Sequence, residues 1–271
     1  KPFGSIARQD DRDGVSGYES HSYGFVAGAD ATVGNLGRLG VAFAYSQANI
    51  DGNSTVAHNS ATVDSYQLVS YGSRSLNDNT DLSFQADIGL HNTHGDRQIS
   101  IGAINRVAQA DYHSWSAHLG AGLARSYAMS AKTTLTPSIR ADYTVLQDKG
   151  YTETGADAVN LIVDGKRTEE MLLSLDAKLT HALSERTTVT ANLGAGYNFL
   201  SERSSITASF AGAPSAAFVT QGAEPSAWLA RGGLGVITKL DNGMELSARY
   251  DVDVREGFSN QTASLKARWM F

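Results

Sequence analysis

The sequence predicts an all-β chain that forms a transmembrane antiparallel up-and-down barrel of twelve strands. Apolar and polar side chains alternate along many stretches, short turn signals alternate with longer polar connections, and the 271 residues include 27 glycines but only 4 prolines. Strand side chains point alternately to the two faces of a sheet, so this alternation marks strands with one apolar face. Many glycines and few prolines suit a chain of strands and turns.

The alternation can be followed from the amino end. A first strand is expected at 1–9, "KPFGSIARQ", and because the chain begins directly in patterned sequence we expect it to lack an upstream part. Further apolar faces follow at 25–33, 39–45, 82–90, 115–123, 135–145, 171–179, 189–199, 244–254 and 263–271. The faces of 66–72 are ambiguous. Pro137 predicts a locally irregular or weakly paired position, because proline has no ladder donor.

The connections set the number of strands. Five are short turns, at 34–37, 77–80, 130–133, 184–187 and 241–243. Six are longer polar loops, at 9–20, 50–61, 94–109, 150–162, 201–224 and 256–260. Eleven connections join twelve strands, and an even number returns the chain to the side where it began. Outer-membrane barrels have this arrangement, with short periplasmic turns and longer extracellular loops.

The polar faces favour a membrane barrel over a soluble one. Any single strand also fits a soluble sandwich, with its polar face in water. Here, however, the polar faces place charges among glycines and small residues, which suits a hydrated lumen. The residues expected to line this lumen are Asp176, Lys178, Arg249, Asp251, Asp253, Arg255, Lys266 and Arg268. Since a membrane leaves no sheet edge unpaired, we expect the last strand to close against the first.

The apolar faces are long enough for tilted membrane spans of about 9 to 11 residues. Aromatic residues near the strand ends fit the girdles at the membrane interfaces; they include Tyr197, Phe199, Tyr250 and Trp269. The lumen charges have two interpretations. They pair with one another for structure, or they tune a pore or hold a polar segment threaded through it.

Composition excludes several other classes. There is no cysteine, which rules out disulfides, thiolate nucleophiles and sulfur-ligated metal sites. The net charge of -6 gives no basic surface for nucleic acid. No apolar run approaches the roughly 20 residues of a membrane helix.

Catalytic and cofactor motifs were sought because some outer-membrane barrels are enzymes. The stretch "GVSGY" at 14–18 lacks the spacing of a Gly-x-Ser-x-Gly elbow, and no phosphate-binding loop occurs, so no cofactor is expected. His91 and His94 are three apart on a strand and should face opposite sides, which disfavours a shared metal. His118 is expected inside as a hydrogen-bonding residue.

Three stretches together resemble the C-terminal β-domains of classical autotransporters, the type V secretion proteins. The opening "DRDGVSGYESHSYGFVAGADATVGNLGRLGVAFAYSQANIDG" is similar to the opening hairpins of that family, and "TPSIRADYTVLQDKGYTETGADAVNLIV" to its Arg-containing strand followed by Tyr-x-Glu-x-Gly-Ala. The terminal "ASLKARWMF" resembles the signal read by the barrel assembly machinery, here Leu265, Ala267, Trp269 and Phe271. The resemblance covers residues 1–271.

The resemblance implies a translocator domain over 1–271 in the outer membrane of a Gram-negative bacterium. It implies as partners the outer-membrane lipids, the barrel assembly machinery, and the protein's own passenger with a linker helix in the lumen, both absent from this chain. No covalent chemistry is expected, and a monomer suffices to close the barrel. A serum-resistance type is one possible subfamily. The alternatives are an outer-membrane barrel enzyme of lipase or protease type and a diffusion porin.

Overall fold

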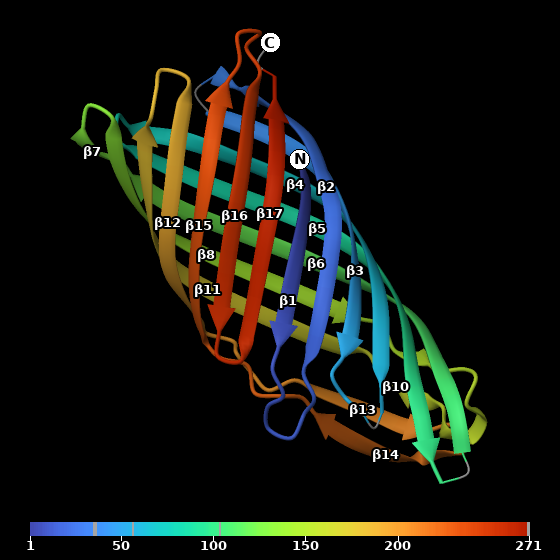
Figure 1. Ribbon diagram of the computed structural model, residues 1–271. Coiled ribbons are helices and arrows are strands. Elements are labelled where there is room, and N and C mark those ends of the chain that lie inside the picture. Colours follow the sequence, from blue (N-terminus) through green and yellow to red (C-terminus); the bar gives the residue numbers. More distant parts are fainter. Residues whose placement is uncertain (35–36, 56, 103, 270–271) are drawn as a thin grey trace.

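The protein folds as one closed antiparallel β-barrel with a small second sheet at one end (Figure 1). The computed structural model describes residues 1–34, 37–55, 57–102 and 104–269. The barrel strands are β1 Pro2–Gln9, β2 Tyr18–Thr32, β3 Arg38–Gly52, β4 Asn59–Asn77, β5 Thr80–Ile101, β6 Ile104–Arg125, β7 Tyr127–Ser130, β8 Thr133–Asp148, β11 Lys166–Ala182, β12 Thr187–Asn198, β15 Trp228–Lys239, β16 Glu245–Arg255 and β17 Phe258–Arg268.

Around the cylinder, the paired strands follow one another in chain order. The β8–β11 and β17–β1 pairings complete the closed cylinder. β8 pairs with both β6 and β11, and β17 pairs with β1. β7 pairs with β8 as a continuation of β6, so the 13 strands of this sheet occupy twelve positions around the barrel. The twelve-stranded barrel, the strand near Lys1 and the closure of the last strand on the first are therefore confirmed.

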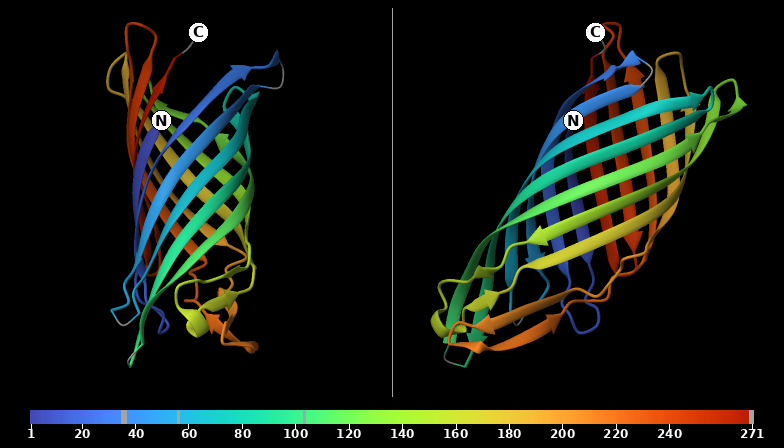
Figure 2. Two further views of the ribbon diagram at one scale, coloured as in Figure 1. Left: turned by 90° about the vertical axis from the view of Figure 1, so that its right-hand side faces the viewer. Right: turned by 180° about the vertical axis from the view of Figure 1, so that it is seen from behind.

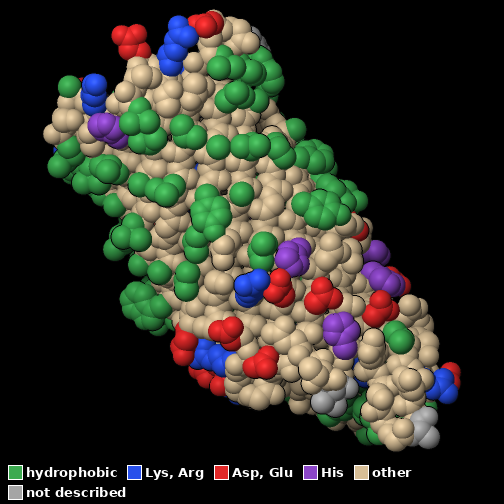
Figure 3. Space-filling view, in the orientation of Figure 1, with side chains coloured by type: hydrophobic (Ala, Val, Ile, Leu, Met, Phe, Trp, Pro, Cys, Tyr) green, Lys and Arg blue, Asp and Glu red, His purple; other side chains and the backbone are tan. Residues whose placement is uncertain are grey.

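The outer face of the barrel is apolar and exposed. Leu175, Leu193 and Leu234 are 62%, 72% and 65% exposed, and they lie in the middle of their strands. Figure 3 shows hydrophobic side chains over the barrel wall and charged and histidine side chains toward its ends. Removing apolar surface from water is worth about 25 cal/mol per Å². A closed barrel with this exterior is therefore stable in lipid rather than in water.

Aromatic side chains contact one another on the outer face of the barrel. Phe25 and Tyr45 lie 6.1 Å apart between ring centroids, and Tyr45 and Tyr66 5.2 Å apart. Farther round, Tyr197 contacts Trp228 at 5.0 Å. These rings form a band at the position of a membrane-interface girdle.

The short turns lie where the sequence predicts them. Turns at 77–80, 130–133 and 184–187 connect consecutive strands, and Gly243, with φ of 79°, stands in the turn before β16. The turn predicted at 34–37 includes two positions outside the described residues. The segment 66–72 is regular, with Tyr66 and Leu68 exposed outside. As expected for Pro137, the β6–β8 ladder ends at Ser138, and β7 resumes pairing at Leu135.

The predicted long loops are more ordered than expected. The segment 94–109 belongs mainly to β5 and β6, which have 22 residues each and extend beyond the membrane band as one hairpin. Because this extension lies outside lipid, neither of its faces has to be continuously apolar, and Asp96, Arg97 and Arg106 are interspersed with apolar residues. The connection predicted at 256–260 is only a tight turn between Arg255 and Phe258, with Gly257 at φ of 69°.

The connections predicted at 150–162 and 201–224 fold together as a four-stranded sheet, called here the cap sheet. It consists of β9 Tyr151–Thr152, β10 Leu161–Val163, β13 Ser205–Phe210 and β14 Ala213–Gln221, in the order β14-β13-β10-β9, with a short 3-10 helix at Asp157–Val159. Figures 1 and 2 show it beyond the strand ends on the long-loop side, next to the tip of the β5–β6 hairpin. A bridge between Gln109 and Thr154 joins it to β6.

A small buried cluster fixes the cap sheet to this tip. Ile99, Ala108 and Ala156 are 5%, 0% and 1% exposed, and Val159 packs against them. Within the described residues, none of the helical segments is long and apolar enough to cross a bilayer.

Candidate functional site

The candidate site is the inner wall of the barrel, where charged groups pair across neighbouring strands. Asp176 on β11 and Arg231 on β15 form an ion pair that crosses β12. Nε of Arg231 donates to Oδ1 of Asp176 at 2.6 Å, and Nη2 donates to Oδ2. The residue between them on β12 is Gly194. A Cβ at Gly194 would lie 1.9 Å from Asp176 Oδ1, so glycine makes the room for this pair.

A second charged group repeats this arrangement one strand farther along. Arg249 on β16 donates to the two oxygens of Asp251 at 2.7 Å each, and to Oδ1 of Asn192 on β12 at 2.7 Å. Gly233 on β15 lies between Asp251 and Asn192. A Cβ there would lie 2.3 Å from Asp251 Oδ1. In both groups, a glycine on the intervening strand therefore leaves room for polar side chains two strands apart to bond.

His118 joins two carboxylates on the opposite part of the wall. Its Nδ1 lies 2.8 Å from Oδ2 of Asp87, and its Nε2 lies 2.9 Å from Oδ1 of Asp142. All three side chains are less than one-fifth exposed. Nε of Arg140 donates to the same Asp142 oxygen at 2.8 Å. The ring of His118 thus bridges carboxylates on β5 and β8.

Asp30 collects three partners near the short-turn end. Arg268 donates from Nη2 to Oδ1 of Asp30 at 2.8 Å, Arg38 donates from Nε to the same oxygen, and the Tyr71 hydroxyl donates to Oδ2 at 3.2 Å. Arg268 is on β17 and Asp30 on β2, so this contact spans the position of β1 between them. It ties the last strand to the first hairpin from inside.

The other residues expected from sequence to line the lumen lie on the same face. Arg255 donates from Nη2 to Glu170 at 2.6 Å. The remaining positions follow from the register, in which Asp253 pairs with Arg231, Lys178 with Asn192, and Lys266 with Ser247. Their assignment as the lining of a hydrated passage stays a prediction. Sequence reasoning had omitted Arg231, Asp87, Asp142 and Asp30, although each occupies a polar position of an alternating strand.

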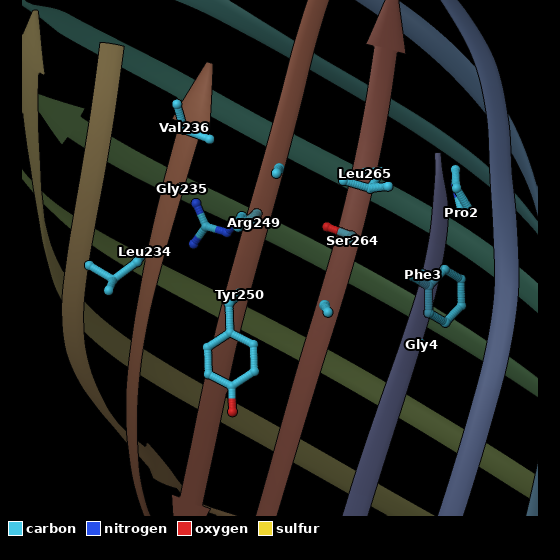
Figure 4. A pocket seen from close by; sticks show the side chains of 12 residues that line it. Pro2, Phe3, Gly4, Leu234, Gly235, Val236, Arg249, Tyr250, Ser264 and Leu265 are labelled. Carbon is cyan, nitrogen blue, oxygen red and sulfur yellow. The ribbon is translucent and has the colours of Figure 1, made fainter. Parts of the chain in front are cut away.

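The proposed C-terminal signal lies mainly on the outer face. Leu265 and Trp269 are 60% and 62% exposed, and Ala267 is in register with the outward Leu246. Phe271 lies outside the described residues. A shallow apolar depression of about 680 Å³ extends over β15, β16, β17 and β1, and Figure 4 shows Leu234, Tyr250 and Leu265 around it.

His91 and His94 lie on opposite faces of the barrel wall. His91 contacts Ser65 Oγ at 2.8 Å and Ser116 Oγ at 2.9 Å on the inner face, while His94 contacts Asp111 Oδ1 at 2.8 Å on the outer face. They therefore cannot share a metal ion. Across residues 1–34, 37–55, 57–102 and 104–269, no three His, Asp or Glu side chains are grouped to hold one.

One tyrosine of the cap sheet, outside the membrane band, has a strongly raised pKa. Tyr151 stacks on Tyr112 with ring centroids 4.6 Å apart and an interplanar angle of 9°. Burial in this contact raises the pKa of Tyr151 to about 12. The tyrosine therefore stays neutral and apolar at the base of the cap.

This barrel matches the family model described as autotransporter beta-domain over residues 1–251. The chain belongs to the autotransporter β-domain family. It is thus the translocator barrel of an autotransporter in the outer membrane of a Gram-negative bacterium, as the sequence resemblance implied.

Individual relatives and solved structures agree with this membership. The chain is 23% identical to esterase EstA of Pseudomonas aeruginosa over 265 residues, which is 94% of this chain and 40% of EstA. It is 29% identical over 285 residues to outer membrane protein A of Rickettsia conorii, covering 100% of this chain and 14% of that protein. The chain therefore spans less than half the length of these relatives.

Solved autotransporter barrels share the fold. The translocator domain of NalP from Neisseria meningitidis superposes with a TM-score of 0.81 at 17% identity, covering 100% of this chain and 86% of that one. The transport unit of AIDA-I from Escherichia coli gives 0.64 at 13% identity, covering 100% and 89%.

Proposed function

We propose that this autotransporter barrel assists the export of an N-terminal passenger through its lumen to the cell surface. The observation that carries the proposal is the inner wall. Its charges are compensated within the wall by Asp176–Arg231 and Arg249–Asp251. A polypeptide of varied sequence can pass such a wall without having to supply a counter-charge at each position.

The proposal fixes the role of each part of the protein. Residues 1–271 act as one translocator domain, and the linker helix and passenger lie outside this chain. The C-terminal strand, with Leu265, Ala267, Trp269 and Phe271, presents the signal to the barrel assembly machinery. The closure of β17 on β1 within one chain supports a monomer as the translocating unit.

We propose further that the barrel itself carries out no covalent chemistry. His91 contacts two serine hydroxyls. A serine hydrolase would require a carboxylate or equivalent group to orient the histidine, while one ring nitrogen activates the nucleophile. Here both ring nitrogens of His91 are bonded to serine hydroxyls.

The route of export can be tested at two adjacent residues. In the full-length protein, a photoreactive amino acid is placed either at Asn192, on the inner face, or at Leu193, which is 72% exposed outside. Cells are irradiated while a slow-folding passenger is stalled in transit. We expect cross-links to the passenger from position 192 and not from 193. Cross-links from 193 alone would contradict passage through the lumen.

A further inference from the structure

The apolar depression on the outer face lies where the last strands of the barrel meet the first. Its lining comes from β15, β16, β17 and β1, and it holds about 680 Å³ of space (Figure 4). The ladder between β17 and β1, which closes the barrel, therefore runs beneath it.

The strand register explains why the surface is hollow here. Outward residues that pair with one another form rows across the strands, and one row consists of Leu234, Tyr250, Ala263, Gly4 and Tyr23. The large side chains of this row are exposed and stand toward its two ends, whereas its centre has only a methyl group and a hydrogen atom. The low stretch is two strand spacings wide, or about 10 Å.

The glycine in this row is not required by the packing of the protein. A Cβ at Gly4 would find its nearest neighbour, the carbonyl oxygen of Ser22, at 3.7 Å, which is an ordinary contact distance. At Gly194, by contrast, a Cβ would lie 1.9 Å from a carboxylate oxygen. Glycine weakens the interior of a strand and often marks a place where a ligand approaches the backbone closely. The space above Gly4 therefore lies on the lipid side and is left open to an external group.

The depression is bounded at one end and continues at the other. The Tyr250 hydroxyl donates to Oε1 of Gln261 at 2.6 Å, and this pair bounds the depression toward the long loops. A second apolar depression of about 410 Å³ shares part of the lining and continues past Leu246 and Ala267 toward the short turns. We call the two depressions together the seam groove. Its floor is formed by Gly4, Ala248, Ala263 and Ala267.

The seam groove is continuous with the lipid-facing surface of the barrel, so its occupant comes from the membrane. A void in an apolar surface forfeits dispersion contacts with the atoms that line it. A hydrocarbon chain is narrow and flexible, and it has no polar group that needs a partner. It can therefore follow the groove as far as Tyr250, whereas the convex surface of a second barrel cannot enter it.

We propose that the seam groove binds one acyl chain of a phospholipid from the periplasmic leaflet. The end of the chain lies over Ala263 and Gly4, and its ester lies near Ala267. This orientation follows from the open end of the groove, because the short turns of such barrels are periplasmic. The inference concerns the outer face alone and does not depend on export of a passenger.

Photoreactive phospholipids test this assignment. The purified full-length protein is reconstituted in vesicles of phosphatidylethanolamine and phosphatidylglycerol, with a trace of phosphatidylethanolamine that carries a diazirine in one acyl chain. The diazirine is placed either at the end of the chain or next to the ester. Cross-links within residues 1–271 are then mapped by mass spectrometry.

We expect the terminal diazirine to label Ala263 and Gly4 about tenfold more than Ala121, an outward residue on β6, which corresponds to a preference of about 1.4 kcal/mol. The diazirine next to the ester should label Ala267 instead. Even labelling around the barrel would overturn the proposal. The reverse order of the two labels would also overturn it, because the head group would then lie in the other leaflet.

A pair of matched variants checks that the groove itself is responsible. Ala263→Leu fills the seam groove, whereas Ala121→Leu adds the same side chain to the outer face of β6. Ala263→Leu should abolish the preferred labelling at Gly4, and Ala121→Leu should leave it unchanged. Heat-modifiability reports whether both variants fold, and the labelling of the unmodified protein remains decisive if one does not. Preferred labelling of Gly4 that persists in folded Ala263→Leu would refute binding in the groove.

Discussion

Arg97 on β5 holds Glu153 of the β8–β11 connection in a bidentate ion pair. Nε donates to Oε1 at 2.9 Å and Nη2 to Oε2 at 2.5 Å, and the Glu153 side chain is only 5% exposed. Glu153 also accepts the amide N–H of Leu161 at 2.7 Å, which fixes the start of β10. The pair is therefore the main polar attachment of the cap sheet to the β5–β6 hairpin.

Removing this attachment should free the cap sheet and leave the barrel intact. Glu153→Ala leaves Arg97 partly buried without its carboxylate, and breaking a buried pair from one side costs about 3–5 kcal/mol. Hydrogen exchange at the Leu161 amide should accelerate accordingly, while heat-modifiability of the barrel stays unchanged. The control is Arg106→Gln, whose partner Asp157 is 76% exposed and whose pair is worth about 0–1 kcal/mol. Similar acceleration in both variants would show that the Arg97–Glu153 pair is not the attachment.

Gly194 should be required for the Asp176–Arg231 ion pair. In Gly194→Ala the new methyl group meets the Asp176 carboxylate and displaces Arg231, and overpacking of this kind costs about 1–3 kcal/mol. The matched control is Gly232→Ala on β15, because its Cβ would find its nearest neighbour at 3.6 Å. We expect a lower urea midpoint for unfolding of the barrel in Gly194→Ala and not in Gly232→Ala. An unchanged midpoint in Gly194→Ala would refute the steric argument.

His94 should titrate at a higher pH than a free histidine. It lies four residues beyond Leu90, which pairs with Tyr66 of the aromatic band, and so is outside the membrane span. The hydrogen bond to Asp111, followed by the charge of that carboxylate, raises the pKa of His94. Its stabilising contribution is complete below the unfolded pKa of about 6.5 and is lost as the pH rises through the folded value.

NMR titration of the His94 ring checks this prediction. Asp111→Asn should bring the midpoint back toward about 6.5, the unperturbed value. Asp96→Asn is the control, because Asp96 has the smallest of the effects on this pKa. Since His94 is half exposed, the overall stability should hardly change in either variant. If the pKa of His94 changed more in Asp96→Asn than in Asp111→Asn, Asp111 would not be the main cause of the raised pKa.

Phe271 should matter more for assembly of the barrel than an exposed aromatic residue on another strand. Deleting Phe271 should reduce the amount of heat-modifiable barrel in outer-membrane fractions, because it removes part of the proposed assembly signal. Trp228→Ala removes a larger ring that is 65% exposed on the outer face but lies on β15. Normal assembly without Phe271 would limit the role of the C-terminal strand to closing the barrel.

The sequence predicted the barrel because period-two alternation is a local property of each strand. The inward positions of Asp176 and Arg249 follow from parity alone. Arg231 was missed because "WLARGGLGVITK", at 228–239, has two adjacent glycines that obscure the alternation. Its partner across Gly194 depends on the register of three strands, which no local pattern contains.

The cap sheet could not be predicted for a related reason. Outside lipid, neither face of the β5–β6 extension has to be continuously apolar, so 98–109 lacks the alternation that marks the membrane strands. β10 is only three residues long, and it becomes a strand through pairing with β13, about 45 residues later in the chain.

The most direct test of the account is the location of the passenger in intact cells. The full-length protein is expressed with and without residues 1–271, and protease is added outside the cells while a periplasmic marker reports leakage. The account predicts a passenger that is digested from outside when the barrel is present and retained in the periplasm when it is absent. A passenger that stays protected while the barrel is correctly assembled in the outer membrane would contradict it.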